Sequence, residues 1–477
     1  DGNFTLSNIE KGTKLTITYV GYKSQTLTWS GSPLNITLQD DANMLEETVV
    51  IGYGTVKKAD LAGSVAVLDS KNFKDQPVAR VEDALNGRMS GVQVMSSGVP
   101  GGAMKIRVRG TSSVNKSNDP LYVVDGIVRE TGLEGISPED IQSIQVLKDA
   151  SSTAIYGARG ANGVVTQVTF DASVGFSNAY HIPEVMGTKE YAQALIDYKG
   201  VSQGAMQDYL DGTKPGIDWM DELLRTGITQ NYKVAVSQGN EKTQTYFSAN
   251  YMDQKGVITD TSSKRYAIKA NMHNKIFDWL EMTTDINLAQ TDNSGADFLQ
   301  NQSNPIWVGL NYSPTMEMMD ANGNYIKDTN NNIQNNPYGI LHGGEYDRKR
   351  TMVTGHVDLK FNLLKGLTFT TTNGIDYNDY KWYNFTSSKV NTSGNSMGNN
   401  DATVTALQST NNLTYNNKWG EHSLTATGVW EVTSNEVRRM GMTGTGIIHE
   451  QVGYWNVADA TSKLLPTAIA SGPCSLV

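Results

Sequence analysis

Cysteine is nearly absent from this sequence, because Cys474 is the only one among 477 residues. A single cysteine excludes an intramolecular disulfide framework and a cysteine-rich zinc site. The six histidines are scattered, and no pair of them has the HxxH or HExxH spacing of a zinc enzyme. We therefore expect no metal site and no other cofactor.

Positive charge and long apolar runs are also scarce. The formal net charge is -10, and the longest basic cluster is only Arg348-Lys349-Arg350. Nucleic acid is therefore not an expected partner, because a phosphate binder needs a dense basic face. No apolar run reaches the ~18 residues of a transmembrane helix, although transmembrane β-strands, apolar only at alternate positions, stay possible. The first residues have no signal-peptide features, so we expect the chain to begin inside a domain.

Motifs that would identify an enzyme are missing as well. The sequence contains no nucleophile elbow, no Walker loop and no dinucleotide-binding fingerprint. The adjacent carboxylates Asp221 and Glu222 have nothing to hold them at the separation that a glycosidase needs. Residues 320–324 resemble a calcium loop but lack its later glycine and glutamate, so an Asx-turn is expected. The sequence predicts that the chain is not an enzyme.

The beginning of the chain has the pattern of short β-strands. Residues 15–22 and 34–38 alternate apolar and polar side chains with a period of two, which is typical of half-buried strands. Residues 40–43 then interrupt the pattern as a linker. The β-prone residues 45–54 follow with no evident hairpin partner, and a lone strand has to pair with a β-edge elsewhere, for example on another protein.

Residues 59–170 have the pattern of a compact α+β domain. Residues 81–87 have helical spacing that ends at a glycine. Ser137 and Pro138 predict the cap and the first residue of a second helix. Strands are expected at residues 92–95, 105–109 and 121–124.

From about residue 229 onward, the sequence consists of alternating strands. We count eight, each about ten residues long, and residues 168–176 would be a ninth. In the clearest case, Val353, Val357 and Phe361 fall on one face, while His356 and Asp358 fall on the other.

The connections between these strands alternate in length. Residues 238–242 and 362–366 are short, whereas residues 291–350 and 381–402 are long and rich in Asn, Gly and Ser. This asymmetry is typical of outer-membrane barrels, and a soluble β-sandwich is the alternative. Aromatic residues near strand ends are candidates for interface bands: Tyr232, Trp279, Tyr377, Tyr380, Trp382, Tyr383, Trp419 and Trp430.

Several segments, in this order, resemble the SusC/RagA family of TonB-linked outer-membrane proteins, which are TonB-dependent receptors. Residues 14–22 (KLTITYVGY) are similar to the end of a carboxypeptidase-regulatory-like domain, and residues 46–56 (EETVVIGYGTV) to the Ton box region. The segments similar to the plug of this family are VEDALNGRMSGVQV (81–94), IRVRGTSS (106–113), PLYVVDG (120–126) and LKDASSTAIYG (147–157).

The resemblance implies a mainly β chain in four parts. Residues 1–44 would be the C-terminal part of a small Ig-like, carboxypeptidase-regulatory-like sandwich, and residues 45–58 the Ton box and linker. Residues 59–170 would form the α+β plug domain. Residues 171–477 would form an incomplete transmembrane antiparallel β-barrel with long extracellular loops.

The resemblance also implies TonB-dependent import of a nutrient across the outer membrane of the cell. The cargo would be an oligosaccharide or a peptide, TonB would act with ExbB and ExbD, and a SusD-like lipoprotein would be the partner at the extracellular mouth. The barrel would contact outer-membrane lipid. The TonB-binding residues would be Thr48, Val49, Val50, Ile51, Gly52 and Tyr53.

Two further sets of plug residues are candidates for a role. Arg107, Arg109 and Asp125 are expected to form ion pairs within the plug or with the barrel, because a buried charge needs a partner. The polar loop of residues 112–119 would face the substrate with the side chains Ser112, Ser113, Asn115, Asn118 and Asp119.

Some features depart from the family pattern. A plugged transporter barrel needs about 22 strands, so eight or nine strands cannot close one, and we expect this chain not to import cargo by itself. Residues 462–477 lack strand alternation and an aromatic C-terminus, and so depart from the sequence that the family pattern leads us to expect there. The alternative function is a surface-exposed adhesin that binds glycans without transport.

Overall fold

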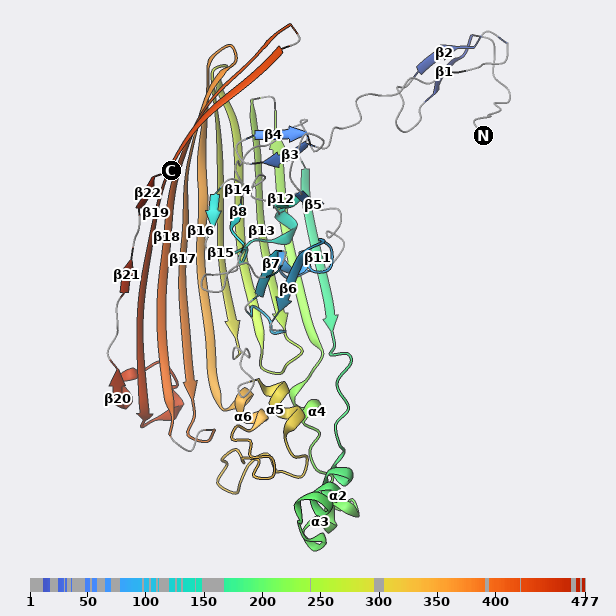
Figure 1. The fold of residues 1–477 in the computed structure, drawn as a ribbon, viewed down its shortest axis with the longest axis vertical. Coiled ribbons are helices and arrows are strands. Elements are labelled where there is room, and N and C mark those ends of the chain that lie inside the picture. The colour runs from blue at the N-terminus through green and yellow to red at the C-terminus, as the bar shows by residue number, and fades with distance from the viewer. Residues whose placement is uncertain are drawn as a thin grey trace. The chain divides into compact units, whose positions relative to one another are not determined.

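The computed structural model of the chain, shown in Figure 1, divides into two compact units. The first contains residues 1–64 and 149–158, and the second contains residues 65–148 and 159–477. The structure describes these residues: 12–17, 25–29, 31, 36, 48–51, 54–57, 65–69, 78–96, 98–102, 104–108, 110, 120–124, 127–129, 132–141, 143–147, 167–240, 242–295, 304–390, 394–420, 422–464, 469–471 and 474–476.

The first unit contains two antiparallel strand pairs. β1 (Lys14–Ile17) pairs with β2 (Gln25–Thr28), and β3 (Thr48–Ile51) pairs with β4 (Gly54–Lys57). The expectation of a lone strand at residues 45–54 was therefore wrong. Only two residues separate β3 from β4, which is the length of a tight hairpin connection, so the chain supplies its own partner strand. Apart from Ile36, the strand expected at residues 34–38 lies outside the described residues.

The second unit begins with the small α+β domain that the sequence predicted. Its helix α1 (Val81–Leu85) ends before Gly87, which has a φ of 70°. Three antiparallel pairs surround it: β5 (Val65–Asp69) with β10 (Ser143–Leu147), β6 (Val92–Ser96) with β7 (Met104–Val108), and β8 (Tyr122–Val124) with β9 (Ile127–Arg129). Its apolar core consists of Leu68, Ala84, Leu85, Met89 and Ile106.

The second predicted helix is only a single 3-10 turn, η3 (Pro138–Asp140). Pro138 does open the turn, but the Ser137 side chain makes no capping hydrogen bond and is buried. The helix does not continue because Ile141 is already extended and leads into β10. The prediction was right about the position of this element and wrong about its length and its cap.

A large antiparallel sheet forms the rest of this unit, and each strand pairs with the next along the chain. The strands are β11 (Gln167–Ser177), β12 (Gly227–Gly239), β13 (Thr243–Lys255), β14 (Ser262–Phe277), β15 (Leu280–Ser294), β16 (Gly344–Leu364), β17 (Leu367–Thr386), β18 (Ser396–Trp419) and β19 (His422–Ile447). The eight predicted strands and the ninth, β11, are confirmed. We call this sheet the wall; it is an incomplete barrel.

One expectation about these strands, their length, was wrong. The strands are 11 to 26 residues long rather than about ten, because the pairing continues past the membrane-spanning stretch toward the long connections. The tail also joins the sheet: β20 (Ala460–Leu464), β21 (Ile469–Ser471) and β22 (Cys474–Leu476) pair with β19. The backbone groups along the open edge of β19 accept these short strands although the tail sequence does not alternate.

The long connections contain helices that the sequence analysis did not predict. They are α2 (Thr188–Lys199), α3 (Gln203–Leu210), α4 (Trp219–Leu223), α5 (Pro305–Asn311) and α6 (Pro337–His342), all at one end of the wall (Figure 1). Asp218, Asn304 and Asn336 cap α4, α5 and α6, each accepting two backbone N–H bonds. Short turns join the strands at the other end, so the predicted asymmetry is confirmed.

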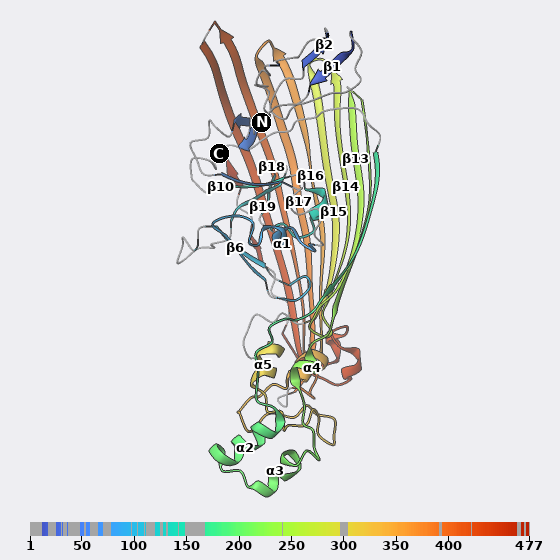
Figure 2. The same ribbon diagram turned by 90° about the vertical axis from the view of Figure 1, so that its right-hand side faces the viewer.

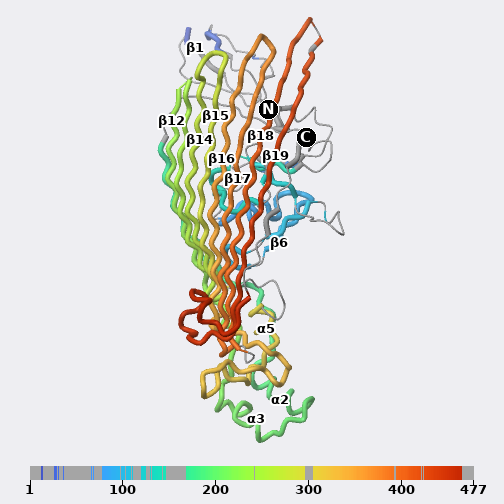
Figure 3. The backbone as a smooth tube through the Cα atoms, turned by 90° about the vertical axis from the view of Figure 1, so that its left-hand side faces the viewer, coloured from blue at the N-terminus to red at the C-terminus, as the bar shows by residue number. Residues whose placement is uncertain are grey.

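The two faces of the wall differ in polarity, as the sequence predicted. On β15 and β16, Ile286 and Val357 are 43% and 37% exposed, whereas Asp285 and His356 on the opposite face are buried. The plug lies on the face with the buried polar side chains (Figure 2, Figure 3). Exposed apolar and buried polar residues are the reverse of a soluble sheet and typical of a transmembrane barrel.

Two bands of aromatic side chains cross the exposed face. Near the short turns, successive rings lie 5.3 to 6.3 Å apart in the order Phe277, Trp279, Phe361, Phe369 and Trp430. Toward the long connections, Tyr251 packs between Tyr232 and Tyr266. Tyr266 and Phe277 are about eleven residues apart on β14, or ~28 Å along the axis of a barrel whose strands tilt by ~40°. This distance matches the hydrocarbon layer of a bilayer.

No helix in the described part of the chain is long and apolar enough to cross a membrane.

Candidate site between the plug and the wall

The first contact between plug and wall is made by Asp140, at the end of the η3 turn. The Nζ of Lys233 on β12 lies 2.7 Å from its carboxylate, and both side chains are about 5% exposed or less. From β13, the Tyr246 hydroxyl donates to the same carboxylate over 2.8 Å, and the Ser248 hydroxyl over 3.1 Å. Two strands of the wall therefore hold one plug carboxylate, which is neutralised and fully hydrogen-bonded.

A chain of polar groups continues from this point along the wall. Glu139 accepts a hydrogen bond from the Asn231 amide over 2.7 Å, and Asn250 donates to Asn231 over 2.8 Å. The buried Arg265 donates to Asn250 over 3.2 Å and to the plug carbonyl of Ala79 over 2.8 Å. The chain thus combines hydrogen bonds across the plug–wall interface, from Asn231 to Glu139 and from Arg265 to Ala79, with hydrogen bonds inside the wall.

A second set of contacts joins the plug to β16 and β17. The Arg350 guanidinium lies 2.6 Å from the Glu134 carboxylate of the plug and also donates to Asn378 over 2.7 Å. Arg350 covers the ring of Tyr380, with 4.7 Å from its Cζ to the ring centroid. Tyr380, which we expected in an interface band, therefore lies on the inner face, because it follows Asp376 and Asn378 at every second position of β17.

Arg129 of the plug lies in the same region and is 1% exposed. Its Nε is 3.7 Å from Asp376, which also accepts a hydrogen bond from Asn378. Burial lowers the pKa of the Arg129 guanidinium, and the opposite charge of Asp376 raises it again only in part. The pair is thus buried, and removal of either charge would leave the other one buried without a counter-charge.

A small cavity of about 30 Å³ separates the plug from the wall, lined by Arg129, Lys269, Asp285 and His356 among others. About 10–15 Å³ suffices for one water, so this space is large enough for one or two water molecules.

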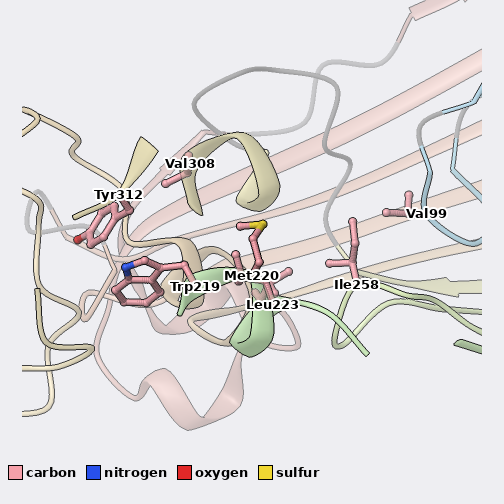
Figure 4. Close-up of a cluster of buried hydrophobic side chains, with 8 residues drawn as sticks. Val99, Trp219, Met220, Leu223, Ile258, Val308 and Tyr312 are labelled. Atoms are coloured by element: carbon pink, nitrogen blue, oxygen red, sulfur yellow. The ribbon is translucent and has the colours of Figure 1, made fainter. Parts of the chain in front are cut away.

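At the long-connection end, a cluster of buried apolar side chains lies between the plug and α4–α6. Figure 4 shows Trp219, Met220 and Leu223 of α4 packed against Val308 and Tyr312, with Ile258 and the plug residue Val99 beyond them. Trp219 and Tyr312 meet edge to face with centroids 5.0 Å apart, and burial raises the pKa of the Tyr312 hydroxyl. We call α4, α5 and α6 with the segment 304–343 the cap.

The predicted site residues are placed as follows. Thr48, Val49, Val50 and Ile51 form β3, whereas Gly52 and Tyr53 lie outside the described residues. Arg107, on β7, is half-buried and donates to the neighbouring carbonyl of Ile106 over 3.1 Å. The other predicted plug residues lie outside the described part of the chain: Arg109, Asp125, Ser112, Ser113, Asn115, Asn118 and Asp119.

One loop prediction is confirmed. Asp320 accepts backbone N–H bonds from Asn322 and Asn324 over 2.9 and 2.8 Å, as expected for an Asx-turn. Among the described residues there is no group of three or more His, Cys, Asp or Glu side chains that could hold a metal ion.

The charged residues that join plug and wall were missed at the sequence level. Glu134, Asp140 and Arg129 belong to no recognisable motif of the plug sequence, and only the fold brings them to the wall. A signal did exist in the wall strands, where polar residues recur at every second position: Asn231 and Lys233, Ser248 and Asn250, Asp376 and Asn378. When polar residues occupy every second position of a predicted membrane strand, they lie on its inner face, which is the face that meets the plug.

Known proteins agree with this architecture. The family model described as TonB-dependent Receptor Plug Domain matches residues 57–164. The TonB-dependent receptor P3 of Formosa agariphila is 31% identical over 98% of this chain and 48% of its own length. The TonB-dependent receptor SusC of Bacteroides thetaiotaomicron is 34% identical over 58% of this chain and 29% of its own length.

Solved structures are similar in fold. The RagAB peptide importer in its open-open state superposes with a TM-score of 0.72 at 24% identity, over 90% of this chain and 54% of that one. The chain spans about half the length of the curated relative P3. The plug match, the relatives and the wall with an enclosed plug agree with one another, and the chain belongs to the SusC/RagA family of TonB-dependent receptors.

Proposed function

We propose that this chain forms the plug and part of the wall of an outer-membrane importer that moves a nutrient when TonB pulls on it. ExbB and ExbD supply the energy to TonB, and a SusD-like lipoprotein covers the extracellular mouth. The cargo is an oligosaccharide or, as the name of the RagAB importer says of that protein, a peptide. Because the chain spans about half of its relative P3, import is proposed for the whole receptor and not for these 477 residues by themselves.

The polar character of the plug–wall contact carries this proposal. The plug keeps its own apolar core of Leu68, Leu85 and Ile106, while Asp140 and Glu134 reach Lys233 and Arg350 of the wall. Ion pairs and hydrogen bonds can be exchanged for water when the plug moves, whereas a shared apolar core could not be opened without a large cost. A plug held in this way can be displaced and can return.

The Ton box residues Thr48 to Tyr53 are the proposed point of attachment. Strand addition by TonB to the β3 segment would carry force along the backbone, because each paired residue adds main-chain hydrogen bonds. β4 already pairs with β3, so TonB adds to the other edge of β3 or replaces β4.

Binding of the intact chain to a purified TonB C-terminal domain tests the proposal. We expect saturable binding that Val50→Pro abolishes, since proline removes a pairing donor and breaks the strand. Thr55→Pro on β4 is the matched control: retained binding indicates addition to the free edge of β3, and tighter binding indicates replacement of β4. Absence of binding by the unaltered chain, with residues 48–53 cleavable by protease, would contradict the proposal and favour the adhesin alternative.

A further inference from the structure

The tip of the plug, residues 98–102, is in contact with both the wall and the cap. Val99 is 8% exposed and belongs to the apolar cluster of the cap with Leu223 and Ile258. Behind it, the Gly101 carbonyl accepts a hydrogen bond from Asn293 of β15 over 3.3 Å. Val99 is the only plug residue in that cluster among the described residues.

The connection between β13 and β14, residues 256–261, lies between the tip and the cap. At Gly256, an added Cβ would come within 2.7 Å of the Pro100 ring, so the glycine lets the tip approach the backbone. The Thr259 N–H donates to the Leu223 carbonyl over 3.0 Å, and the Arg225 guanidinium donates to the carbonyls of Gly256 and Thr261. We call residues 256–261 the bridging loop.

The bridging loop is also joined to the last helix of the cap. His342 Nδ1, at the end of α6, lies 2.5 Å from the Asp260 carboxylate. Asp260 has a φ of 57°, in the left-handed region that few residues other than glycine adopt. The ring of His342 packs on Tyr338 with centroids 3.9 Å apart.

We propose that Val99, Ile258 and the His342–Asp260 pair form a latch that couples the cap to the tip of the plug. The residues are positioning residues: none is assigned a contact with cargo. When the cap moves away from the wall, Ile258 moves with it and Val99 loses its apolar site. By thermodynamic reciprocity, withdrawal of the plug loosens the cap to the same extent.

The purpose of the latch rests on the proposed import function, because coupling the cap to the plug would let events at the extracellular mouth bias release of the plug. The coupling itself is a property of the folded chain and does not need TonB. Its test can therefore fail while TonB binding succeeds, or the reverse.

Hydrogen exchange of the intact chain in detergent micelles tests the coupling. In Val99→Ala, we expect exchange at least ~10-fold faster at Val308 and Ile340, whose amides close the first turns of α5 and α6. In His342→Phe, which keeps a ring against Tyr338, we expect faster exchange at Thr259, and also at Gly102, whose amide donates to the Val99 carbonyl.

Leu85→Ala is the matched control, because Leu85 lies in the plug's own core and outside the cap cluster. It should speed exchange in the plug and leave Val308 and Ile340 unchanged. The latch is refuted if Val99→Ala leaves the cap amides within ~2-fold of the unaltered chain. It is equally refuted if Leu85→Ala opens the cap as much as Val99→Ala does, since the cap would then only report overall loosening. Should Val99→Ala fail to fold, the His342→Phe result at Gly102 decides alone.

Discussion

The wall and the cap of this molecule are built with opposite polarity. In the cap, Trp219, Leu223 and Val308 are buried and form an ordinary apolar core. In the wall, Ile286 is 43% exposed while Arg265 is 3% exposed. An apolar side chain therefore lies at the surface in the wall, as Ile286 does, and in the core in the cap, as Leu223 does.

The difference shows which solvent each region meets. A cap in water gains stability when apolar area is removed from water. A wall in lipid loses nothing by exposing apolar side chains, and its polar residues have to turn inward, where the plug supplies partners. The plug combines both patterns, with an apolar core of its own and charged residues at its surface toward the wall.

The largest effect is expected where the inward-facing charges of the wall meet the plug. Asp376→Leu leaves Arg129 buried without its counter-charge, and we expect a loss of about 3–5 kcal/mol in the free energy of unfolding, because an unpaired buried charge is not solvated. Urea titration of the chain in micelles measures this. The double variant Asp376→Leu with Arg129→Met should recover most of the loss. If Asp376→Leu lowers the free energy of unfolding by less than ~1 kcal/mol, water reaches the Arg129–Asp376 pair and the pair is not buried as the structure shows.

In the cap, the largest loss of stability is expected from a substitution that leaves a cavity in the apolar cluster. Leu223→Ala, at a fully buried site, should cost about 2–5 kcal/mol through lost burial and the cavity that remains. The loss should be confined to the cap and measured as faster proteolysis within residues 304–343, with the wall still resistant. Proteolysis of the wall strands at the same rate would show that cap and wall unfold together.

On the outer face of the wall, a charge should be costly although the site is exposed. Ile286→Arg lies between the two aromatic bands, and we expect about 2–4 kcal/mol of destabilisation from placing a cation in hydrocarbon. Trp307→Arg is the matched control in the cap, because Trp307 is 41% exposed and faces water; its cost should stay near ~0.5 kcal/mol. Equal costs for the two variants in lipid bilayers would contradict the assignment of the wall to the membrane.

The smallest effect is expected in a connection outside the membrane. Burial of the Glu450 carboxylate acts to raise its pKa, but hydrogen bonds from Ser387, Ser388 and Asn395 outweigh it and lower the pKa to about 2. A depressed carboxylate pKa stabilises the fold above the unfolded value of about 4.5, and this contribution is lost as the pH falls from there toward 2. Tryptophan fluorescence between pH 5 and 2 should show a transition that Glu450→Gln removes; an identical profile in the variant would disprove the assignment.

The sequence predicted the elements of this fold far better than its contacts. Alternation with a period of two identified β12 to β19, because apolar and polar residues alternate within each strand according to the face on which they lie. It gave no account of the helices α4 to α6, whose caps Asp218, Asn304 and Asn336 are common in loops as well. β4 was overlooked because a four-residue strand is too short to show a period.

The kind of contact at the candidate site was predicted, but Asp140, Glu134 and Arg129, which make the described ion pairs, were not. The ion pairs of Arg107, Arg109 and Asp125 stay a prediction, since Arg109 and Asp125 lie outside the described residues. Which charge is buried depends on which turn of the plug meets the wall, and no local pattern contains that information.

The sequence by itself determined the family, the strand periodicity, and the inward and outward faces of the wall, because these depend on residues that are near one another along the chain. Only the tertiary structure decided that Asp140 meets Lys233, that Glu134 meets Arg350 and that Val99 enters the cap. Those contacts join residues about 90 to more than 200 positions apart, and their energies exist only once burial has removed the water that would otherwise satisfy each group.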